Sequence, residues 1–187
     1  MAYADDLLAV AQDLAALDAL NPREATRRRS ISTAYYALFH LLISEAVANW
    51  QRADQRYILV RLFDHGPMNT AALSKISELN AYFNGDPPSG PRRMLAENLH
   101  NVASAFVAAQ QARFDADYNV GKEVTGTMMR RQIESVRDAF DSWRAIRDEP
   151  DAQMFLLSLL ANKRAAAKEG KPQNYSKGKK RKAKPSR

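Results

Sequence analysis

Residues 23–50 form a long helical segment whose second half is apolar on nearly every side. Large aliphatic and aromatic residues occupy almost all helical positions there, so no face is left for solvent. Such a helix is stable only when other helices surround it. The segment therefore predicts a helical bundle with this helix at its centre. Its large apolar positions are Ile31, Tyr35, Leu38, Phe39, Leu41, Leu42, Ile43 and Val47.

The rest of the chain shows helical periodicity, without strand alternation or an internal repeat. We predict a turn at His65-Gly66-Pro67, with Asn69 as the cap of the next helix. A Gly- and Pro-rich loop is expected over residues 84–91. The fold class is all-α, an up-and-down bundle of four main helices plus short helices. The main helices are predicted at 4–19, 23–50, 92–114 and 124–147, and the short ones at 53–64, 69–83 and 154–160.

Charge divides the chain into a body and a tail. From Lys163 onward there are eleven Lys and Arg against one acid, Glu169, so the tail carries +10. The other 17 basic and 20 acidic residues give the body a charge of −3. We predict a helical bundle over residues 1–150, a short apolar helix over 151–162 and a basic, disordered tail over 163–187.

The basic tail is a candidate nucleic-acid-binding segment. Its positive field would attract phosphate backbones without sequence specificity, and Tyr175 could stack on a base. A solubilising tail without a ligand is the alternative. The cations expected to bind nucleic acid are Lys177, Lys179, Lys180, Arg181, Lys182 and Lys184, together with Arg29 in the body.

Cysteine is absent, so the chain has neither disulfides nor a thiolate metal site. The three histidines lie far apart, without carboxylates at zinc-type spacing, and neither a metal nor a cofactor is expected. We find no uninterrupted apolar run of membrane-spanning length, and the first residues do not follow the pattern of a secretion signal. The chain is therefore expected to be cytoplasmic and to make no membrane contact.

A polar stripe crosses the otherwise apolar central helix, at spacings of three and four residues. Buried polar atoms need partners, so this stripe must face a cleft, a polar group or water. One interpretation places Arg29 and His40 beside Arg113 in a phosphate-binding cleft. The alternative is that His40 is a satisfied core or interface histidine. The stripe consists of Arg29, Thr33, Tyr36, His40 and Ser44.

Two short motifs resemble HEPN domains, a family of small helical bundles. Residues 32–40 read Ser-Thr-Ala-Tyr-Tyr-Ala-Leu-Phe-His, and residues 113–118 read Arg-Phe-Asp-Ala-Asp-Tyr where a long helix ends. Leu-Phe-Asp-His-Gly at 62–66 is compatible with the same family, and the resemblance spans residues 4–147. It implies a homodimer. In ribonuclease members an Arg-x(4–6)-His motif from each subunit meets at the dimer cleft, and the 2′-hydroxyl attacks the phosphate without a metal ion.

The chain departs from this nuclease motif because no His follows Arg113 within the required window. Tyr118 stands there instead, and a tyrosine, with an ordinary pKa of about 10, is a poor general base at neutral pH. Asp117 lies at helical reach of Arg113, so an ion pair closing the helix end is the alternative to a phosphate site. A literal match at Arg93 and His100 is expected by chance in a chain this rich in arginine.

Three hypotheses follow. The first is a HEPN-like homodimer that binds nucleic acid, with RNA favoured, or a nucleotide-bearing partner without catalysis. The second is a metal-independent ribonuclease in which Arg113, Tyr118 and His40 are catalytic. The third is a protein-interaction scaffold without a phosphate ligand. Because family members recur in toxin–antitoxin and phage-defence systems, an antitoxin or other partner protein is a further expectation.

Overall fold

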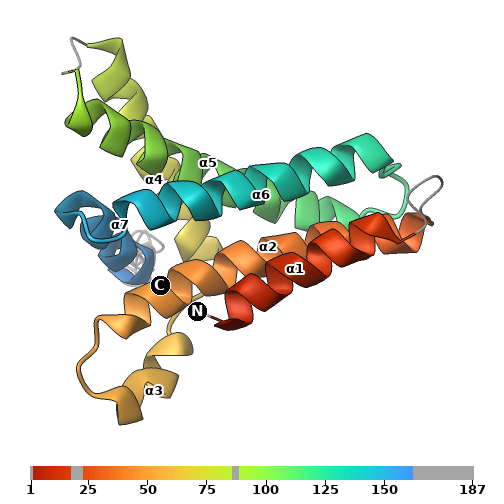
Figure 1. Ribbon diagram of the computed structural model, residues 1–187, viewed down its shortest axis with the longest axis horizontal. Helices are drawn as coiled ribbons and strands as arrows, with labels where there is room; N and C mark the ends of the chain where they lie inside the picture. Colours follow the sequence, from red (N-terminus) through yellow and green to blue (C-terminus); the bar gives the residue numbers. More distant parts are fainter. Residues whose placement is uncertain (1, 18–22, 86–88, 162–187) are drawn as a thin grey trace, which may run out of the picture.

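The computed structural model describes residues 2–17, 23–85 and 89–161. Throughout these ranges all regular structure is helical, which confirms the all-α fold class (Figure 1). The helices are α1 (Ala2–Ala16), α2 (Glu24–Ala48), the short 3₁₀ helix η1 (Ala53–Gln55), α3 (Arg56–Val60), α4 (His65–Asn84), α5 (Pro91–Tyr118), α6 (Gly126–Ile146) and α7 (Pro150–Ala161).

Helices α1, α2, α5 and α6 lie side by side and alternate in direction, forming an up-and-down four-helix bundle (Figure 1). Helix α2 contacts each of the other three, as expected for the central helix. Its apolar positions and those of its neighbours form one continuous core. The largest fully buried side chains of that core include Tyr35, Phe106, Phe140 and Trp143.

Helix α2 is also long and apolar enough to cross a membrane by length and composition, with a mean hydropathy of 1.3 over its most apolar window. In this protein 67% of that window is buried against other helices. Tyr35, Leu38 and Leu42 are fully inaccessible to solvent. Its hydrophobicity is therefore explained by its place at the centre of the bundle.

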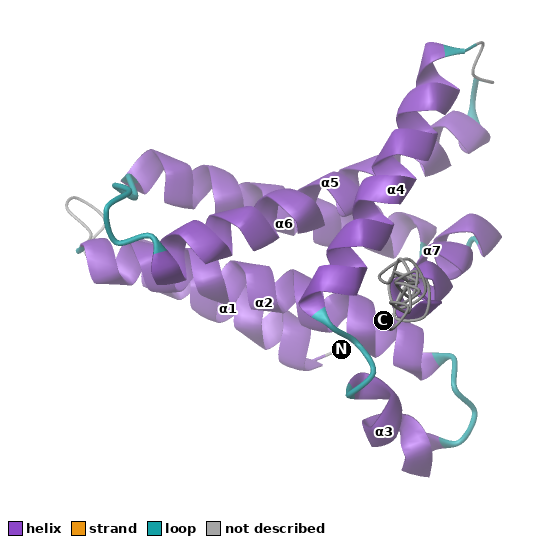
Figure 2. Ribbon diagram, turned by 180° about the vertical axis from the view of Figure 1, so that it is seen from behind, coloured by secondary structure: helices purple, strands orange, loops and turns teal. Residues whose placement is uncertain are grey.

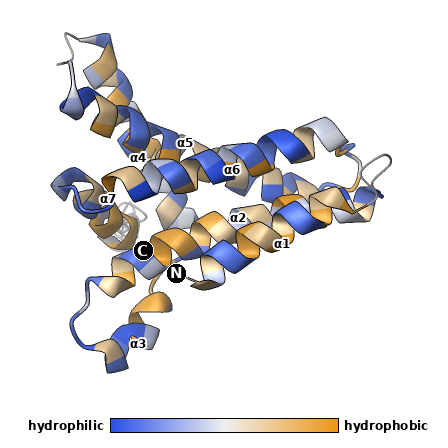
Figure 3. Cartoon of the chain, in the orientation of Figure 1, coloured by the Kyte–Doolittle hydropathy of each residue, from blue (hydrophilic) through white to orange (hydrophobic). Residues whose placement is uncertain are grey.

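The remaining helices pack around the left end of the bundle in Figure 1. Helix α4 crosses α5 and diverges from it toward its C-terminal end, while α3 stands away from the bundle (Figure 2). Helix α7, hydrophobic along most of its length (Figure 3), packs against α4 and α2. Its residues Phe155, Leu156 and Leu159 are buried in the common core. The short helix predicted at 151–162 therefore docks on the bundle of its own chain.

Several helix boundaries differ from the prediction, and two of the differences affect the site. His65-Gly66-Pro67 is the first turn of α4, because Asp64 is extended at the N-cap (φ −142°, ψ 139°) and proline is tolerated in a first turn. Asn69 therefore lies inside the helix, where its side chain bonds Gln110. Helix α5 continues to Tyr118, one turn beyond the predicted end.

Candidate functional site

The polar stripe of α2 lies at the surface of the bundle, as its spacing predicted. Thr33, Tyr36, His40 and Ser44 are half-buried and Arg29 is exposed, whereas Tyr35 and Ala37 beside them are buried. The stripe borders the C-terminal part of α5 and the first turn of α4, through contacts of Tyr36. This junction of three helices is the candidate site.

Arg113 on α5 and Tyr36 on α2 join the two helices at the centre of the site. Arg113 Nη2 donates a hydrogen bond to the Tyr36 hydroxyl at 2.8 Å. The guanidinium also lies 5.5 Å from the centre of the Tyr36 ring, within the range of a cation–π contact. Because the phenol oxygen accepts this bond, its own proton remains available for a further acceptor.

Asp117 neutralises part of the Arg113 charge. Its Oδ2 lies 2.8 Å from Arg113 Nε, one helical turn away. The Nε–H does not point at the carboxylate well enough for a hydrogen bond. The Ser32 hydroxyl donates to the other carboxylate oxygen and ties Asp117 to α2. The predicted Arg113–Asp117 ion pair is therefore present, and a phosphate would have to share Arg113 with it.

Tyr118 lies at the exposed edge of the site, because α5 extends far enough to include it. Its hydroxyl is 3.4 Å from Arg113 Nη2, and its ring lies 5.3 Å from the guanidinium carbon. The side chain is 61% exposed and contacts the Phe114 ring. Phe114 and Val120 are exposed as well, so an apolar surface borders the cationic group.

His65, to which the sequence assigned no role, belongs to this site. His65 was expected in a turn, but it is half-buried in the first turn of α4, and its ring lies 4.4 Å from the Phe39 ring and 6.1 Å from the Tyr36 ring. Burial and the charge of Arg113 both lower the pKa of His65, while Asp64 opposes them. His65 is therefore mainly neutral at pH 7.

The Tyr35 hydroxyl determines which nitrogen of His65 carries the proton. It lies 2.5 Å from His65 Nδ1, and Tyr35 is fully buried, which raises the pKa of the phenol. Across residues 2–17, 23–85 and 89–161 this hydroxyl has no other hydrogen-bond partner. A buried O–H needs an acceptor, so the hydroxyl donates to Nδ1. The ring proton is then on Nε2, which makes Nε2 a donor.

His40 lies next to Tyr36 without touching Arg113. Its ring is 6.5 Å from that of Tyr36 and 5.0 Å from that of Tyr3 on α1. It lines a small cavity of about 130 Å³ with Tyr3, Ser44 and Val60. Burial and, second, the charge of His65 lower the pKa of His40. His40 is therefore adjacent to the Arg113 group but outside its hydrogen-bond network.

Two adjacent arginines at the start of α2 have opposite environments. Arg28 donates to the main-chain oxygens of Ala116, Asn119 and Lys122 at 3.0, 3.2 and 2.6 Å. It thereby satisfies carbonyls at the end of α5, where a helix lacks partners of its own. Arg29 is exposed, and its side chain makes no hydrogen bond or ion pair within the described ranges. No hydrogen bond or ion pair joins Arg29 to the Arg113 group within these ranges, so the predicted position of Arg29 beside Arg113 stays a prediction.

The literal Arg93/His100 match consists of two separate surface contacts. Arg93 Nε pairs with Glu97 at 2.8 Å, one turn along α5. His100 instead bonds Asn80 of α4 at 3.1 Å. The two side chains do not converge on a common site.

The basic tail, with Tyr175 and the predicted cations at 177–184, lies outside the described residues. In the part of the chain that the structure describes, no three His, Asp or Glu side chains gather into a metal-binding group.

The site contains one cation and several hydrogen-bond donors that have few acceptors nearby. Arg113, the hydroxyls of Tyr36 and Tyr118, and Nε2 of His65 all supply N–H or O–H groups. Within the described ranges, Asp117 is the one carboxylate that forms an ion pair with Arg113, and Asp64 lies beside His65. Such an excess of donors suits an anion with several acceptor oxygens. Sequence patterns missed His65 because it lies 48 positions from Arg113 and was expected in a turn.

No family model matches this chain, and neither a curated protein nor a solved structure does.

Proposed function

We propose that the protein is a HEPN-like homodimer that binds nucleic acid, RNA in particular, through the Arg113 site and the basic tail, without cleaving it. A phosphate is the ligand that the site fits best, because its oxygens accept from both guanidinium and phenol donors. A cytoplasmic setting with an antitoxin or similar partner protein is part of the same proposal.

The observation that carries this proposal is the convergence of Arg113, Tyr36 and Tyr118 at one partly open surface. Their donors come from two helices that the core holds in place, so the group is preorganised. The exposed apolar surface of Phe114, Tyr118 and Val120 supports association of two copies next to the site.

The tautomer of His65 favours binding over catalysis. A general base must present a lone pair to the proton that it removes. With Tyr35 donating to Nδ1, His65 Nε2 carries a proton and can only donate to a phosphate oxygen. This arrangement suits recognition of a phosphate and disfavours attack by a 2′-hydroxyl.

A metal-independent ribonuclease is the second candidate, and the proximity of His65 to Tyr36 favours it. If the Tyr35 hydroxyl rotated away and the ring lost its proton from Nε2 to solvent while gaining one at Nδ1, Nδ1–H would donate to the phenol oxygen and the Nε2 lone pair would be free. His65, rather than the His expected after Arg113, would then be the base. A scaffold without a phosphate ligand is supported instead by the Arg113–Asp117 ion pair.

Incubation of RNA with the purified protein and a chelator separates these functions. Under our proposal the RNA stays intact and is retarded in a gel, and Arg113→Ala weakens retardation. Cleavage that disappears in both Arg113→Ala and His65→Gln would establish the ribonuclease instead. Absence of both binding and cleavage would favour the protein-interaction scaffold without a phosphate ligand.

Arg93→Ala provides a matched control, since Arg93 is also an α5 arginine paired with a carboxylate one turn away. It should leave RNA binding close to that of the wild type. An equal loss in Arg93→Ala and Arg113→Ala would mean that any positive charge suffices, which contradicts a specific site.

A further inference from the structure

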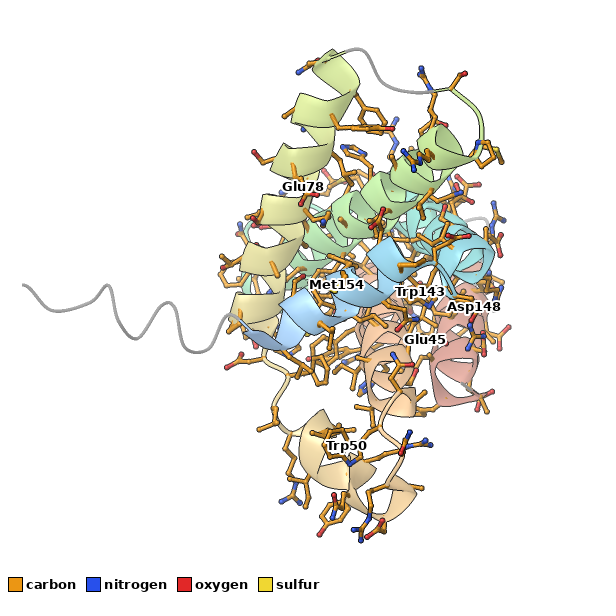
Figure 4. All side chains as sticks on the ribbon, turned by 90° about the vertical axis from the view of Figure 1, so that its left-hand side faces the viewer. Glu45, Trp50, Glu78, Trp143, Asp148 and Met154 are labelled. Carbon is orange, nitrogen blue, oxygen red and sulfur yellow. The ribbon has the colours of Figure 1, made fainter. Side chains whose placement is uncertain are left out.

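A second cavity, of about 630 Å³, opens between α4, α5 and α7, at the other end of α5. Figure 4 looks toward this region, with Glu78 on α4 and Met154 on α7 at its borders. Its volume is that of a pocket for a drug-sized ligand or an inserted side chain. Its apolar wall consists of Leu79, Tyr82, Leu95, Ala96, Leu99 and Met154.

The rim of this cleft is charged, with acids in excess. Lys75 and Glu78 neutralise each other in an ion pair of 2.7 Å. Arg92 is then the only remaining lining cation, against the carboxylates of Glu149 and Asp151. Neither carboxylate has an ion-pair partner within the described ranges. The cleft therefore suits a ligand with an apolar or aromatic group flanked by positive charges.

The chain itself contains such a segment. Residues 162–187 directly follow α7, which forms one wall of the cleft, and carry eleven of the 28 Lys and Arg residues. Tyr175 is the only aromatic residue among them, with Lys171 and Lys177 on either side. The fourteen positions from Ala161 to Tyr175 can span up to about 45 Å. The path back along the twelve residues of α7 is only about 18 Å.

We propose that the basic C-terminal segment docks into this cleft of its own chain, with Tyr175 against the apolar wall and neighbouring lysines near Glu149 and Asp151. Docking would hide an aromatic ring and place positive charges beside unpaired carboxylates. A ligand that binds the tail would have to displace the tail from the cleft. Docking would therefore weaken binding of that ligand. The docking itself does not depend on nucleic-acid binding.

The absence of cysteine allows a direct test by disulfide trapping in the full chain. Ser176→Cys, next to Tyr175, is combined with Met154→Cys, which lines the cleft. The matched control combines Ser176→Cys with Met94→Cys, because both methionines are 62% exposed but Met94 lies outside the cleft lining. Mild oxidation at low protein concentration is followed on non-reducing gels, which separate intrachain from interchain bonds.

We expect the 154–176 bond to form about tenfold faster than the 94–176 bond, because docking raises the local concentration of one thiol near the other. Glu149→Gln with Asp151→Asn, or Tyr175→Ala alone, should bring the 154–176 rate down to the control. Equal rates for the two pairs would overturn the proposal. Bonds that form only between chains would overturn docking within one chain.

Discussion

Arg113 on α5 donates a hydrogen bond to the hydroxyl of Tyr36 on α2 at 2.8 Å, across 77 positions of sequence. The bond joins the two longest described helices at the polar stripe of α2. It also brings a guanidinium next to the rings of Tyr36 and Tyr118. This contact gives the site its cation and helps to hold the bundle together.

Arg113→Ala should lower the free energy of unfolding by about 1–3 kcal/mol, because it leaves Asp117 and Tyr36 without their partner. A double-mutant cycle with Tyr36→Phe, measured by urea unfolding, should give a coupling of about 1 kcal/mol. Tyr118→Phe is the control, since its hydroxyl is exposed and 3.4 Å away. Additive effects of Arg113→Ala and Tyr36→Phe would show that the bond contributes no stability.

Arg28→Ala should destabilise the protein by about 1–3 kcal/mol, whereas Arg29→Ala should stay within about 0.5 kcal/mol. Arg28 holds carbonyls at the end of α5, and Arg29 is exposed. Thermal unfolding of the two variants measures the difference. RNA binding should show the opposite order. When binding is measured at several salt concentrations, its salt dependence should be smaller in Arg29→Ala than in Arg28→Ala. Equal melting temperatures would contradict the anchoring role of Arg28.

Stability should decrease as the pH falls through 6.5. The folded-state pKa values of His65 and His40 lie below the ordinary value of 6.5, so the unfolded chain binds protons there that the folded chain does not. Their contribution to stability is therefore present above pH 6.5 and is lost as the pH falls toward the lowered folded-state values. Urea unfolding at several pH values measures the slope. His65→Gln and His40→Gln should each reduce the slope of the free energy of unfolding against pH. An unchanged slope in both variants would show that these histidines do not cause the pH dependence.

Phe155→Ala should lower the free energy of unfolding by about 3–5 kcal/mol, as expected for a large cavity in the core. Leu157→Ala, on the same helix, should change it by less than about 0.5 kcal/mol. Phe155 is inaccessible to solvent and Leu157 is 58% exposed. Similar small effects for both would mean that α7 does not contribute to the bundle core.

Deletion of residues 163–187 should abolish most of the salt-sensitive binding of nucleic acid, since it removes eleven cations. The salt dependence of the binding constant, measured by fluorescence anisotropy, should fall in the deleted protein. Its melting temperature should fall only slightly, because the described core ends at Leu160 and the deletion removes no more than the docked tail. Unchanged binding with an unchanged salt dependence would place the nucleic-acid site in the bundle alone.

The sequence predicted the site in part. Periodicity placed Tyr36 and His40 on an accessible stripe, and helical spacing predicted the Arg113–Asp117 pair, because both are local relationships. It did not separate the anchoring role of Arg28 from the exposed position of Arg29, because that difference depends on where the end of α5 packs against α2. His65 was missed because Gly66-Pro67 resembles a turn, although a proline is also accepted in the first turn of a helix.

Local pattern was enough to determine the all-α class, the central position of residues 23–50 and the separation of charge between body and tail. These features depend on residues a few positions apart, whose spacing on a helix is constant. The tertiary structure decided that Arg113 meets Tyr36, that Tyr35 orients His65, and that α7 packs on its own chain. Those contacts join distant segments, and their geometry depends on how far each helix extends and how the helices pack.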